Sequence, residues 1–416
     1  MSECGCDAPK AGPKLKPIEE ALEFLLDRAV PVSEVEQVPV SQALGRVLAQ
    51  TVESRIDVPP WDNSAMDGYA VKHADLQGDS PRLAVSQRIP AGSAGSTLVT
   101  GSAARIFTGA PIPPGADTVV IQEACRQEDG FVTIQQVPAK GANVRSAGED
   151  IRVGDEVLAA GTRLMPQHLG LAASVGVATL PVLRRLKVAV FSSGDELVMP
   201  GGSLGPGQIF NSNQFTLSGL LEALGCEVMQ LGIVEDTFET TCDALAQGAE
   251  QADLVVASGG VSVGEEDHVK PAVEKLGSLE LWKVAIRPGK PLAFGYIGNT
   301  PFIGTPGNPV SLFITFCIFA RPFILKTQGV KSDFMPAAIT AKADFDRAKP
   351  DKRREYARAR MSVDDRGEVR VELYPNRSSG VLSSVAWANG LAVIPEQQAL
   401  AKGDRVQFIP FSELIA

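Results

Sequence analysis

The sequence predicts a multidomain protein in which a central parallel α/β sheet domain is combined with β-rich domains. First, buried-type apolar runs between about 185 and 334 alternate with stretches of helical periodicity, which is typical of a parallel sheet covered by helices. Second, residues 54–148 and 335–416 contain short apolar segments separated by Gly and Pro, as β structure does. Third, helical periodicity on either side of the first β region predicts a helical or mixed linker domain.

Composition limits the class of protein. With 416 residues and 44% hydrophobic content, the chain can form several cores, and its length predicts three or four domains. The formal net charge of −10 argues against a nucleic-acid-binding protein, since such proteins carry a basic surface. No apolar run approaches the roughly 18 residues of a membrane span, and the N-terminal segment lacks the apolar centre of a signal peptide. We therefore expect a cytoplasmic protein that binds neither nucleic acid nor membrane.

Cysteine and histidine residues form no recognisable disulfide or metal pattern. The six cysteines are scattered along the chain, which is typical of reduced thiols. Cys4 and Cys6 stand in a polar segment, 1–14, that we expect to be a flexible tail. The three histidines are too dispersed in sequence to predict a zinc site or a Ser-His-Asp triad.

The linker domain is expected to be discontinuous. Helical periodicity covers 18–29, and a second helix is expected to start at Ser41, which can cap it. A further helical stretch returns at 165–176, beyond the first β region. We therefore expect 15–53 and 149–184 to form one framework domain.

Two other regions are expected to form β domains, one from 54 to 148 and one, barrel-like, from 335 to 416. The strands expected in the first are RLAVSQRI, ARIFTG, DTVVIQE and FVTIQQV. Those expected in the second are REYARARM, EVRVELYP and RVQFIPF.

The central domain, 185–334, is expected to hold a parallel sheet. Its buried-type strands are LKVAVFSS, CEVMQLGIV and DLVVASGG. They alternate with the helices NSNQFTLSGLLEALG and TFETTCDALAQGAEQ. Because the carboxyl ends of parallel strands meet at one edge of a sheet, the loops that follow these strands are the expected ligand site.

Three loops would meet at that edge: SSGDE (192–196), VEDT (234–237) and SGGVSVGEED (258–267). Gly259 and Gly260 would let backbone N–H groups approach a phosphate closely. Neither a Walker A motif nor a GxGxxG fingerprint is present, which argues against a P-loop NTPase and a dinucleotide dehydrogenase.

The segment WKVAIRPGKP would supply cations. Strand alternation places Lys283 and Arg287 on one face, and Pro288-Gly289 fits the centre of a type II turn. Arg287 and Lys290 would flank this turn, and an anion between them would offset their repulsion. A solvated surface turn is an equally strong alternative.

The segment TPGNPVS predicts a second anion site. Asn308 can cap a helix, and Pro309 suits the first helical position. The N–H groups near Val310 and Ser311 would then be available to an anion at the helix N-terminus.

Acidic residues at the same sheet edge predict a divalent cation. Glu196, Asp236 and Asp267 all follow strands, and a carboxylate beside a phosphate is tolerated best when a hard cation such as Mg²⁺ bridges them. The alternative is that Glu265, Glu266 and Asp267 stabilise a helix N-terminus, and for the two glutamates we favour this alternative.

Seven motifs also occur in a recognisable order: PPWDNSAMDGYAV, RIFTGAPIPPGADTVV, GED, SSGDEL, SGGVSVGEED, WKVAIRPGKP and TPGNPVS. With these motifs the sequence resembles the MoeA/gephyrin family over nearly its whole length. The resemblance implies an elongated homodimer with four domains per chain, the third being an α/β domain of the molybdopterin-binding type. Bacterial members of the family are molybdopterin molybdenumtransferases, which use adenylyl-molybdopterin, molybdate and Mg²⁺ to form molybdenum cofactor and AMP. The implied partners are a molybdopterin adenylyltransferase that donates the substrate and maturation proteins of molybdoenzymes.

The resemblance also assigns roles by position. The catalytic positions are Asp67, Thr108, Glu196, Asp236 and Asp267, and the metal positions are the last three of these. The substrate-binding positions are Ser193, Gly194, Asp195, Ser258, Gly259, Gly260, Lys283, Pro306, Gly307 and Pro309. The molybdate-binding positions are Arg287, Lys290, Ser311, Arg358 and Ser379. Since the second domain faces the partner's α/β domain in the family, the active site is expected to span the dimer interface.

One departure and several alternatives accompany the resemblance. Arg287 stands where many relatives have Lys, which retains the charge but changes the donor geometry. In DNSAMDGYA, Asp62, Asn63 and Asp67 could merely cap turns. A scaffold role, as in the gephyrin relatives, and another nucleotide hydrolase are the alternative functions. The sequence does not distinguish molybdate from tungstate as the substrate.

Overall fold

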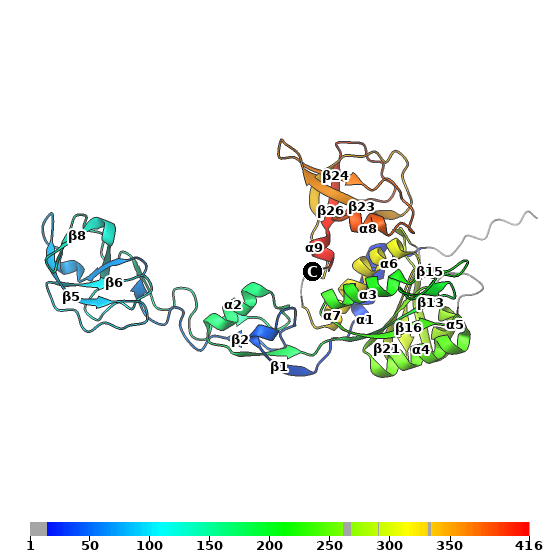
Figure 1. The fold of residues 1–416 in the computed structure, drawn as a ribbon, viewed down its shortest axis with the longest axis horizontal. Coiled ribbons are helices and arrows are strands. Elements are labelled where there is room, and N and C mark those ends of the chain that lie inside the picture. The colour runs from blue at the N-terminus through cyan, green and yellow to red at the C-terminus, as the bar shows by residue number, and fades with distance from the viewer. Residues whose placement is uncertain (1–14, 261–267, 290, 332–333, 416) are drawn as a thin grey trace, which may run out of the picture.

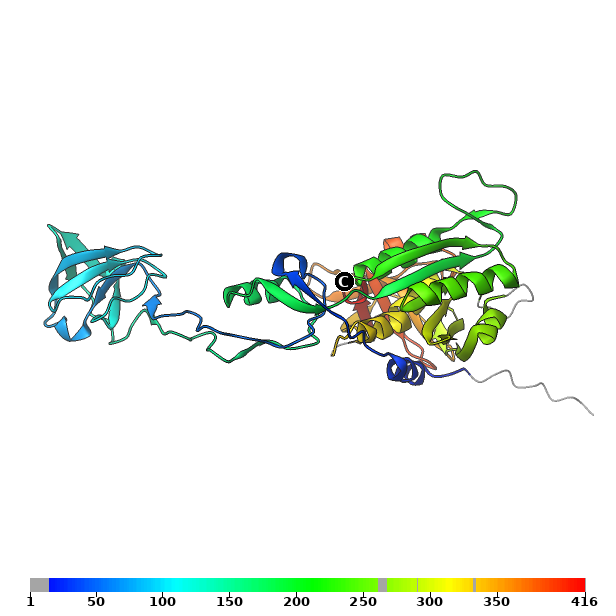
Figure 2. The ribbon, with the colours of Figure 1, turned by 90° about the horizontal axis from the view of Figure 1, so that it is seen from below.

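The computed structural model describes residues 15–260, 268–289, 291–331 and 334–415. The chain is elongated, with the β-rich domain at one end and the α/β and C-terminal domains together at the other (Figure 1). A narrow neck and a small framework unit connect the two ends, and the view from below shows the same separation (Figure 2). Asp267 and Lys290 lie outside the described residues, so their expected roles stay predictions.

A six-stranded sheet forms the centre of the α/β domain, in the order β16-β13-β17-β21-β20-β18. Its strands are β13 (Lys187–Ser193), β16 (Glu227–Val234), β17 (Leu254–Ser258), β18 (Gly277–Lys283), β20 (Pro291–Ile297) and β21 (Thr300–Thr305). Strands β13, β16, β17 and β21 run parallel to one another, as the sequence predicts for β13, β16 and β17. Strand β20, in contrast, is antiparallel to both of its neighbours, β21 and β18. The sheet is therefore mixed. Strands β20 and β21 are antiparallel because only Gly298 and Asn299 connect them, whereas a parallel pair needs a long crossover.

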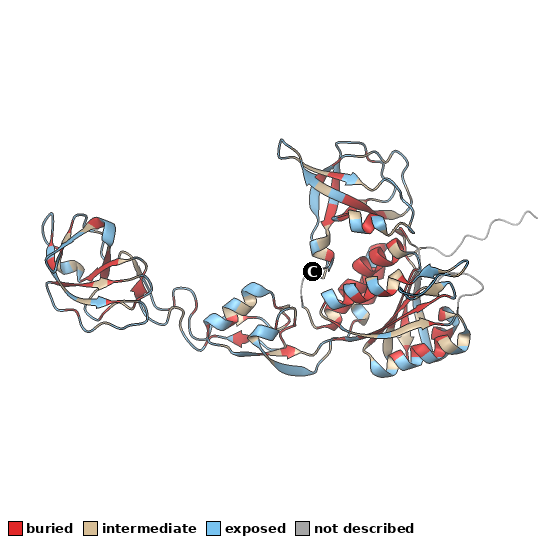
Figure 3. Ribbon diagram, in the orientation of Figure 1, coloured by how far each residue is buried: buried red, intermediate tan, exposed pale blue. Residues whose placement is uncertain are grey.

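Alternate residues of the buried strands face opposite layers of helices. In β13, Val188 and Val190 pack in the core that includes α3 and α6, whereas Ala189 and Phe191 pack in the core that includes α4 and α5. The strands and the inner helix faces are accordingly buried (Figure 3). The helices are α1 (Ile18–Arg28), α3 (Ser212–Ala223), α4 (Phe238–Gln251), α5 (Val269–Leu276), α6 (Pro309–Thr315) and α7 (Arg321–Thr327).

Helix α1 packs on the α/β domain and not on the framework unit to which the sequence assigned it. Leu22 and Leu25 share a core cluster with Phe323 of α7. Phe24 lies edge-to-face against Phe294 of β20, with 6.1 Å between ring centroids. The assignment was wrong for this helix because its apolar stripe fits the larger α/β core, where it is removed from water.

The helix from Pro309 to Thr327 is a core helix. It consists of α6, a π-helical turn over Phe316–Ala320 and α7. The helix has 19 residues, and an 18-residue window within it has a mean hydropathy of 1.6, so by length and composition alone it could cross a membrane, which the sequence reading overlooked. However, 94% of this 18-residue window is buried inside the protein, as expected for the core helix of a globular domain.

The framework unit joins two segments that are far apart in sequence. β1 (Val35–Pro39) pairs antiparallel with β12 (Thr179–Leu183), and β2 (Val52–Glu53) pairs with β11 (Glu156–Leu158). The helix expected near 165–176 is present as α2 (Pro166–Ser174).

The helix expected to start at Ser41 is absent. Only a 3-10 turn, η1 (Val40–Gln42), forms there. Gly45 has a φ of +73°, which ends helical geometry, and Leu48 then forms a bridge with Val182. The periodicity was misread because this short segment extends to contact β12.

The β-rich domain contains a six-stranded sheet in the order β7-β4-β6-β5-β9-β8. Its strands are β4 (Gly68–Val71), β5 (Arg82–Ile89), β6 (Ser102–Ile106), β7 (Thr118–Ile121), β8 (Cys125–Glu128) and β9 (Phe131–Ile134). The short turns η2 (His73–Asp75) and η3 (Gln122–Ala124) connect some of them. A two-stranded pair, β3 (Asn63–Ser64) and β10 (Val144–Arg145), lies beside the neck, in which Val58 bridges Ile151. All four strands predicted here are present.

The C-terminal domain is a closed five-stranded barrel. Its strands are β22 (Ile339–Ala343), β23 (Arg354–Val363), β24 (Val369–Leu373), β25 (Gly390–Ile394) and β26 (Arg405–Pro410). The barrel closes because β23 pairs with both β24 and β25. A short strand of the preceding domain, β19 (Ile286–Arg287), pairs parallel with β23 and ties the barrel to the α/β domain. The short helices α8 (Ser383–Trp387) and α9 (Phe411–Ile415) also contribute residues to the α/β core.

The cysteines among the described residues are free thiols. Cys125 is partly buried, and Cys226, Cys242 and Cys317 are buried. Burial raises the pKa of the Cys226 thiol to about 12, so this thiol is protonated and unreactive at neutral pH. The expectation of reduced thiols agrees with this arrangement, and Cys4 and Cys6 lie outside the described residues.

Candidate active site

A cavity of about 990 Å³ lies between the carboxyl edge of the α/β sheet and the C-terminal barrel. Strands β13 and β17 end at this cavity with Ser193 and Ser258, and the segment after β21 also lines it. The cavity is thus at the sheet edge where the sequence predicts the ligand site. The predicted substrate-binding residues that line it are Ser193, Gly194, Ser258, Gly259, Gly260, Pro306, Gly307 and Pro309.

Two helices point their N-termini at the cavity. Helix α3 begins after Asn211, whose side chain caps it by accepting a hydrogen bond of 3.3 Å from the Gln214 backbone N–H. Helix α6 begins after Asn308, and Asn308 and Pro309 both line the cavity. Because backbone N–H groups and the helix dipole both favour negative charge, these two ends are suited to an anionic ligand.

One N–H group expected to bind an anion has a protein partner instead. The Val310 N–H donates a hydrogen bond of 3.0 Å to the carbonyl oxygen of Ser379, so it is not available to a ligand. The contact brings the barrel loop that contains Ser379 onto the start of α6. Ser311 and Ser379 both line the cavity, as their predicted roles require.

Asn213 joins two of the glycine-containing loops. Its side-chain amide donates hydrogen bonds of 2.9 Å to the Ser258 hydroxyl and 2.7 Å to the Gly307 carbonyl. Its Oδ1 atom is buried and has no hydrogen-bond partner in the structure. Sequence reasoning assigned no role to Asn213, although its position in the first turn of a helix after a predicted sheet-edge loop was a usable signal.

The carboxylates at the sheet edge are coupled through hydrogen bonds. The Ser193 hydroxyl donates to Asp236 Oδ1 at 3.0 Å, and the Asp236 backbone N–H donates to Asp195 Oδ1 at 3.2 Å. Asp236 and Glu196 line the cavity, whereas Asp195 does not. Asp195 therefore supports the loop that carries Asp236.

Magnesium is compatible with these residues. No group of three or more His, Cys, Asp or Glu side chains is gathered for a metal within the part of the chain that the structure describes. Mg²⁺, however, is usually held by one or two carboxylates together with phosphate oxygens and water. The Asp236 and Glu196 carboxylates and the Ser193 hydroxyl in this cavity are oxygen donors of the kind that Mg²⁺ prefers.

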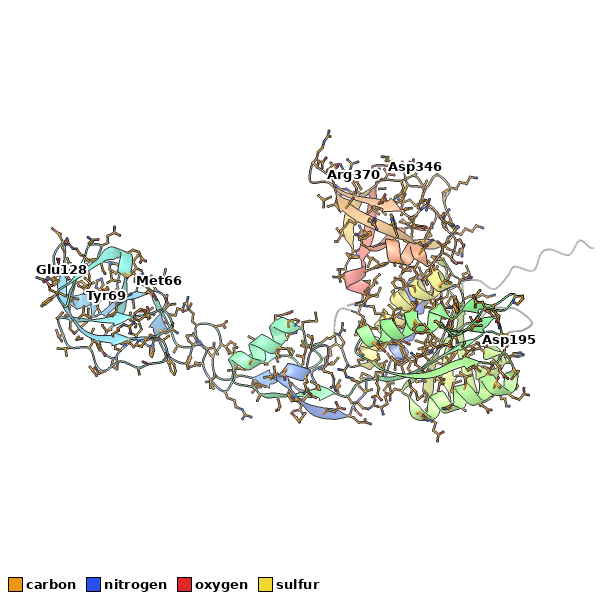
Figure 4. The ribbon with its side chains drawn as sticks, in the orientation of Figure 1. Met66, Tyr69, Glu128, Asp195, Asp346 and Arg370 are labelled. Carbon is orange, nitrogen blue, oxygen red and sulfur yellow. The ribbon has the colours of Figure 1, made fainter. Side chains whose placement is uncertain are left out.

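Asp67 and Thr108 lie close to each other but far from the cavity. Thr108 donates from its backbone N–H and from its hydroxyl to Asp67 Oδ1, both at 2.8 Å. The backbone hydrogen bond, followed by the hydroxyl one, lowers the pKa of Asp67 below its usual value. Met66, the neighbour of Asp67, and Asp195 appear at opposite ends of the molecule (Figure 4). A single chain therefore does not bring the two groups of predicted catalytic residues together.

The structure describes Arg287, Pro288 and Gly289 of the RPGK segment, for which the sequence left an anion site and a solvated surface turn open. The Arg287–Pro288 peptide is cis, and Gly289 has a φ of +87°. Arg287 does not line the cavity, and its Nη1 atom donates to Asp351 at 2.5 Å. Gly289 does line the cavity, whereas Lys283, at the end of β18, does not.

Within the described residues, the basic residue that lines the cavity is Arg353, which the sequence reading missed. It stands just before β23, at the end of the loop that connects β22 to β23. Nothing local in the sequence distinguishes it, because the segment from 352 to 354 contains three consecutive cations.

Arg358 is buried on the outer side of the barrel strand β23, the side on which Tyr356 joins the α/β core, whereas Ala357 and Ala359 face the barrel core. Its guanidinium donates to the Ser384 hydroxyl at 2.9 Å and to the carbonyls of Asn376 and Ser378 at 2.7 and 3.1 Å. Burial lowers its pKa, although an arginine remains charged. Arg358 does not line the cavity. It holds the loop that leads to Ser379, which does line the cavity, so its role in this structure is to fix that loop.

Comparison with known proteins identifies all the main parts of the chain. Residues 16–176 match the MoeA N-terminal region (domain I and II), 189–326 match a probable molybdopterin binding domain, and 340–411 match the MoeA C-terminal region (domain IV). A molybdopterin molybdenumtransferase from Haemophilus influenzae is 39% identical over 401 residues, which cover 96% of this chain and 99% of that protein. Another from Nostoc is 38% identical over 371 residues, covering 87% of this chain and 85% of that protein.

Solved structures give the same result. The crystal structure of the molybdopterin biosynthesis MoeA protein from Pyrococcus horikoshii matches with a TM-score of 0.81 and 29% identity, covering 95% of this chain and 100% of that chain. The N-terminal, molybdopterin-binding-type and C-terminal regions follow one another in the order of the domains described above. The chain therefore belongs to the MoeA family.

Proposed function

We propose that the protein is a molybdopterin molybdenumtransferase, which inserts molybdate into adenylyl-molybdopterin and releases AMP in a Mg²⁺-dependent reaction. The observation that carries the proposal is the cavity, in which two helix N-termini face the carboxylates of Asp236 and Glu196. A pyrophosphate needs N–H donors, and a cation between the phosphates and the carboxylates would remove their repulsion. The names of the curated relatives support the same activity.

Phosphate binding falls to the loops and helix starts. Gly259 and Gly260 allow the backbone to approach the pyrophosphate, and the first turns of α3 and α6 supply positive partial charge. The Gly259 N–H is not a free donor, because it donates to the Thr305 carbonyl oxygen at 3.2 Å. Asn213 fixes the Ser258 and Gly307 loops to each other before the substrate arrives. Such preorganisation stabilises charge that develops when the phosphoanhydride bond breaks.

Asp236 and Glu196 would hold magnesium, with Ser193 orienting the Asp236 carboxylate through its hydroxyl. Bound Mg²⁺ would supply a Lewis acid that withdraws charge from the phosphoanhydride. Asp267, outside the described residues, is proposed as a further ligand because its position in the SGGVSVGEED motif matches a metal position of the family.

A homodimer would complete the site. Thr108 is exposed and Asp67 is partly exposed, and the β-rich domain that carries them lies at the opposite end of the molecule from the α/β domain (Figure 1). We propose that the Asp67–Thr108 pair reaches the cavity of a partner subunit. These two residues would then act in catalysis at the partner's cavity, since they do not reach the cavity of their own chain. Asp67, kept ionised by its two hydrogen bonds, would contribute a fixed negative charge beside the partner's substrate.

The proposed setting is the cytoplasm. The proposed donor of the substrate is a molybdopterin adenylyltransferase, because its product is the adenylylated pterin. Maturation proteins of molybdoenzymes are the proposed acceptors. The acidic net charge of −10 and the burial of the one membrane-length helix among the described residues support a protein that binds neither nucleic acid nor membrane.

The decisive experiment incubates purified protein with adenylyl-molybdopterin, Mg²⁺ and either molybdate or tungstate. AMP release and activation of an apo-molybdoenzyme are followed together. Molybdate-dependent formation of both products is expected, and the tungstate reaction shows the oxyanion preference. AMP release without cofactor formation would favour a nucleotide hydrolase, and absence of both products would favour a scaffold role.

A further inference from the structure

Arg353 is the only residue with a cationic side chain among the described residues that line the cavity. It belongs to the C-terminal domain, whereas the carboxylates of Asp236 and Glu196, which line the same cavity, belong to the α/β domain. Its side chain is 21% exposed, so much of it is removed from water. A cation in such a place is favoured when an anion binds beside it, because the reduced dielectric strengthens their attraction.

Asp351 fixes the position of Arg353. The Arg353 backbone N–H donates to Asp351 Oδ1 at 3.0 Å, and the guanidinium Nε lies 3.5 Å from the same oxygen. The guanidinium Nη1 also donates to the carbonyl of Ile286 at 3.4 Å. Within the described residues no hydrogen bond uses Nη2, so the guanidinium keeps donors for a ligand.

The other oxygen of Asp351 engages the α/β domain. Asp351 Oδ2 accepts a hydrogen bond of 2.5 Å from Arg287 Nη1, at the end of the short strand β19. β19 pairs with the start of β23, with Ile286 opposite Arg354. One carboxylate thus joins the two domains that form the cavity walls. Burial would raise the pKa of Asp351, but the hydrogen bonds from Arg287 and the Arg353 backbone outweigh it and lower the pKa, so the carboxylate is ionised at neutral pH.

The charges around Asp351 do not cancel. Arg287 and Arg353 carry two positive charges against one carboxylate, and only Arg353 borders the cavity. One positive charge therefore remains in excess beside the cavity that Arg353 lines. Gly289, Ser311 and Ser379 line the same cavity, and the two serines could add hydroxyl donors.

We propose that Asp351 is a positioning residue that holds the Arg353 guanidinium at the cavity wall, where the guanidinium binds a tetrahedral oxyanion of the substrates. Molybdate and the phosphates of the pterin nucleotide share this chemistry. The identity of these two ligands rests on the proposed function, whereas the binding of an oxyanion by Arg353 can be measured without turnover. Arg287 donates to the same Asp351 carboxylate and so helps to fix it.

The test uses the full-length protein with three variants: Arg353→Gln, Asp351→Asn and the double variant. Equilibrium binding of molybdate and of AMP is measured separately, and the molybdate concentration for half-maximal cofactor formation is measured at saturating adenylyl-molybdopterin. Arg353→Gln should weaken oxyanion binding about 10- to 150-fold, as expected for the loss of a charge-assisted hydrogen bond. Asp351→Asn should weaken it about 3- to 30-fold, because Arg353 remains but is held less firmly.

The double variant separates positioning from a general structural effect. If Asp351 acts through Arg353, adding Asp351→Asn to Arg353→Gln should change binding by less than about 2-fold, since the group that Asp351 positions is already gone. Equal fold losses in both backgrounds would overturn the positioning role. Weaker molybdate binding alone assigns Arg353 to molybdate, and weaker AMP binding alone assigns it to the nucleotide phosphate.

Asp364→Asn is the matched control. Asp364 lies in the same barrel, accepts hydrogen bonds from two backbone N–H groups and pairs with Arg370 at 2.8 Å. Its side chain is 24% exposed, compared with 26% for Asp351, but it does not line the cavity. The control should bind both ligands as the unmodified protein does. Unchanged molybdate and AMP binding in Arg353→Gln, or no binding of either by the unmodified protein, would overturn the inference. Binding without cofactor formation in the unmodified protein would contradict only the proposed function.

Discussion

Thr108 donates two hydrogen bonds to a single oxygen of the Asp67 carboxylate, one from its backbone N–H and one from its hydroxyl, each 2.8 Å long. This pair is assembled on the β-rich domain, far from the cavity that holds Asp236. A carboxylate so firmly oriented on an exposed surface is well suited to act on a ligand held by another subunit. The arrangement leads directly to a test of a shared active site.

Mixing two inactive variants should restore activity if the site is shared. Asp67→Asn and Asp236→Asn should each abolish most cofactor formation without dissociating the dimer. After subunit exchange, random pairing gives half heterodimers, each with one intact site, so activity should recover to about a quarter of the unmodified value. Light scattering verifies the dimer, and mixed-mass labelling verifies exchange. No recovery despite proven exchange would exclude a site that combines these residues from two chains.

Asp236 should act through magnesium. Asp236→Asn keeps the size of the side chain, and the Ser193 hydroxyl can still donate to its carbonyl oxygen. The thermal unfolding temperature should therefore change little, while AMP release falls and the Mg²⁺ concentration for half-maximal activity rises, because a charged ligand is lost. Titration of Mg²⁺ at saturating substrate provides the measurement.

Ser193→Ala supplies a graded comparison for the magnesium prediction. It removes only the hydrogen bond to the Asp236 carboxylate, so its effect on the Mg²⁺ requirement should be smaller than that of Asp236→Asn. An unaltered Mg²⁺ requirement in Asp236→Asn, together with a large loss of thermal stability, would instead assign Asp236 to the structure of the loop.

Gly289 should tolerate no side chain, for two separable reasons. Its φ of +87° is unfavourable for other residues, and an added Cβ would lie 3.2 Å from the Cβ of Ser311. Gly289→Ala should destabilise the protein by about 1 kcal/mol or more and should also impair molybdate binding, because Ser311 on the cavity wall must shift. Urea unfolding and molybdate binding measure the two effects.

Gly298→Ala is the control for the backbone term. Gly298 has a φ of +58°, but an added Cβ would have nothing within 4 Å. The Gly298→Ala variant should lose about as much free energy of unfolding as Gly289→Ala does, and it should keep full molybdate affinity. If both variants bind molybdate equally well, the contact between Gly289 and Ser311 does not shape the site.

The contact between Asp253 and Arg184 should make stability depend on pH. Asp253 accepts hydrogen bonds of 2.6 and 2.8 Å from the Arg184 guanidinium and 2.8 Å from the Lys187 backbone N–H. Burial alone would raise the pKa of Asp253, but these donors outweigh it, so the pKa is lowered in the folded state. Asp253→Asn should therefore reduce the free energy of unfolding by about 1–3 kcal/mol at pH 7.

The sign of the pH effect follows from the lowered pKa. The contribution of the Asp253 carboxylate is fully present above its unfolded pKa of about 3.9 and is lost as the pH falls through the lower folded pKa. Urea unfolding at pH 7, 5 and 3 should show the gap between the two proteins closing only at the lowest pH. Asp27→Asn, at an exposed position of α1, should show no comparable gap. A gap that persists unchanged at pH 3 would contradict the role of the carboxylate.

Local patterns in the sequence were sufficient for most of the elements. The prediction RLAVSQRI coincides with β5 (Arg82–Ile89), and the alternation of β13, α3, β16, α4 and β17 is present as expected. These elements follow from side-chain periods of 2 and 3.6 residues, which are visible within about ten neighbouring residues. The same patterns placed Ser193, Asp236 and Ser258 after parallel strands, so their meeting at one cavity could be predicted from topology.

Tertiary structure alone decided the contacts that depend on how separate domains pack. Arg287, whose predicted role in oxyanion binding stays a prediction, pairs with Asp351, which is 64 residues away in the sequence, and Arg353 lines the cavity. The β-rich domain, which carries the Asp67–Thr108 pair, likewise lies at the opposite end of the molecule from the α/β domain, which carries Asp236 (Figure 1). A periodic pattern states which face of an element is apolar but not which distant charged group lies across a domain boundary. The way in which the domains pack decides which carboxylate lies beside a given cation, so the geometry of this site could be determined only from the folded chain.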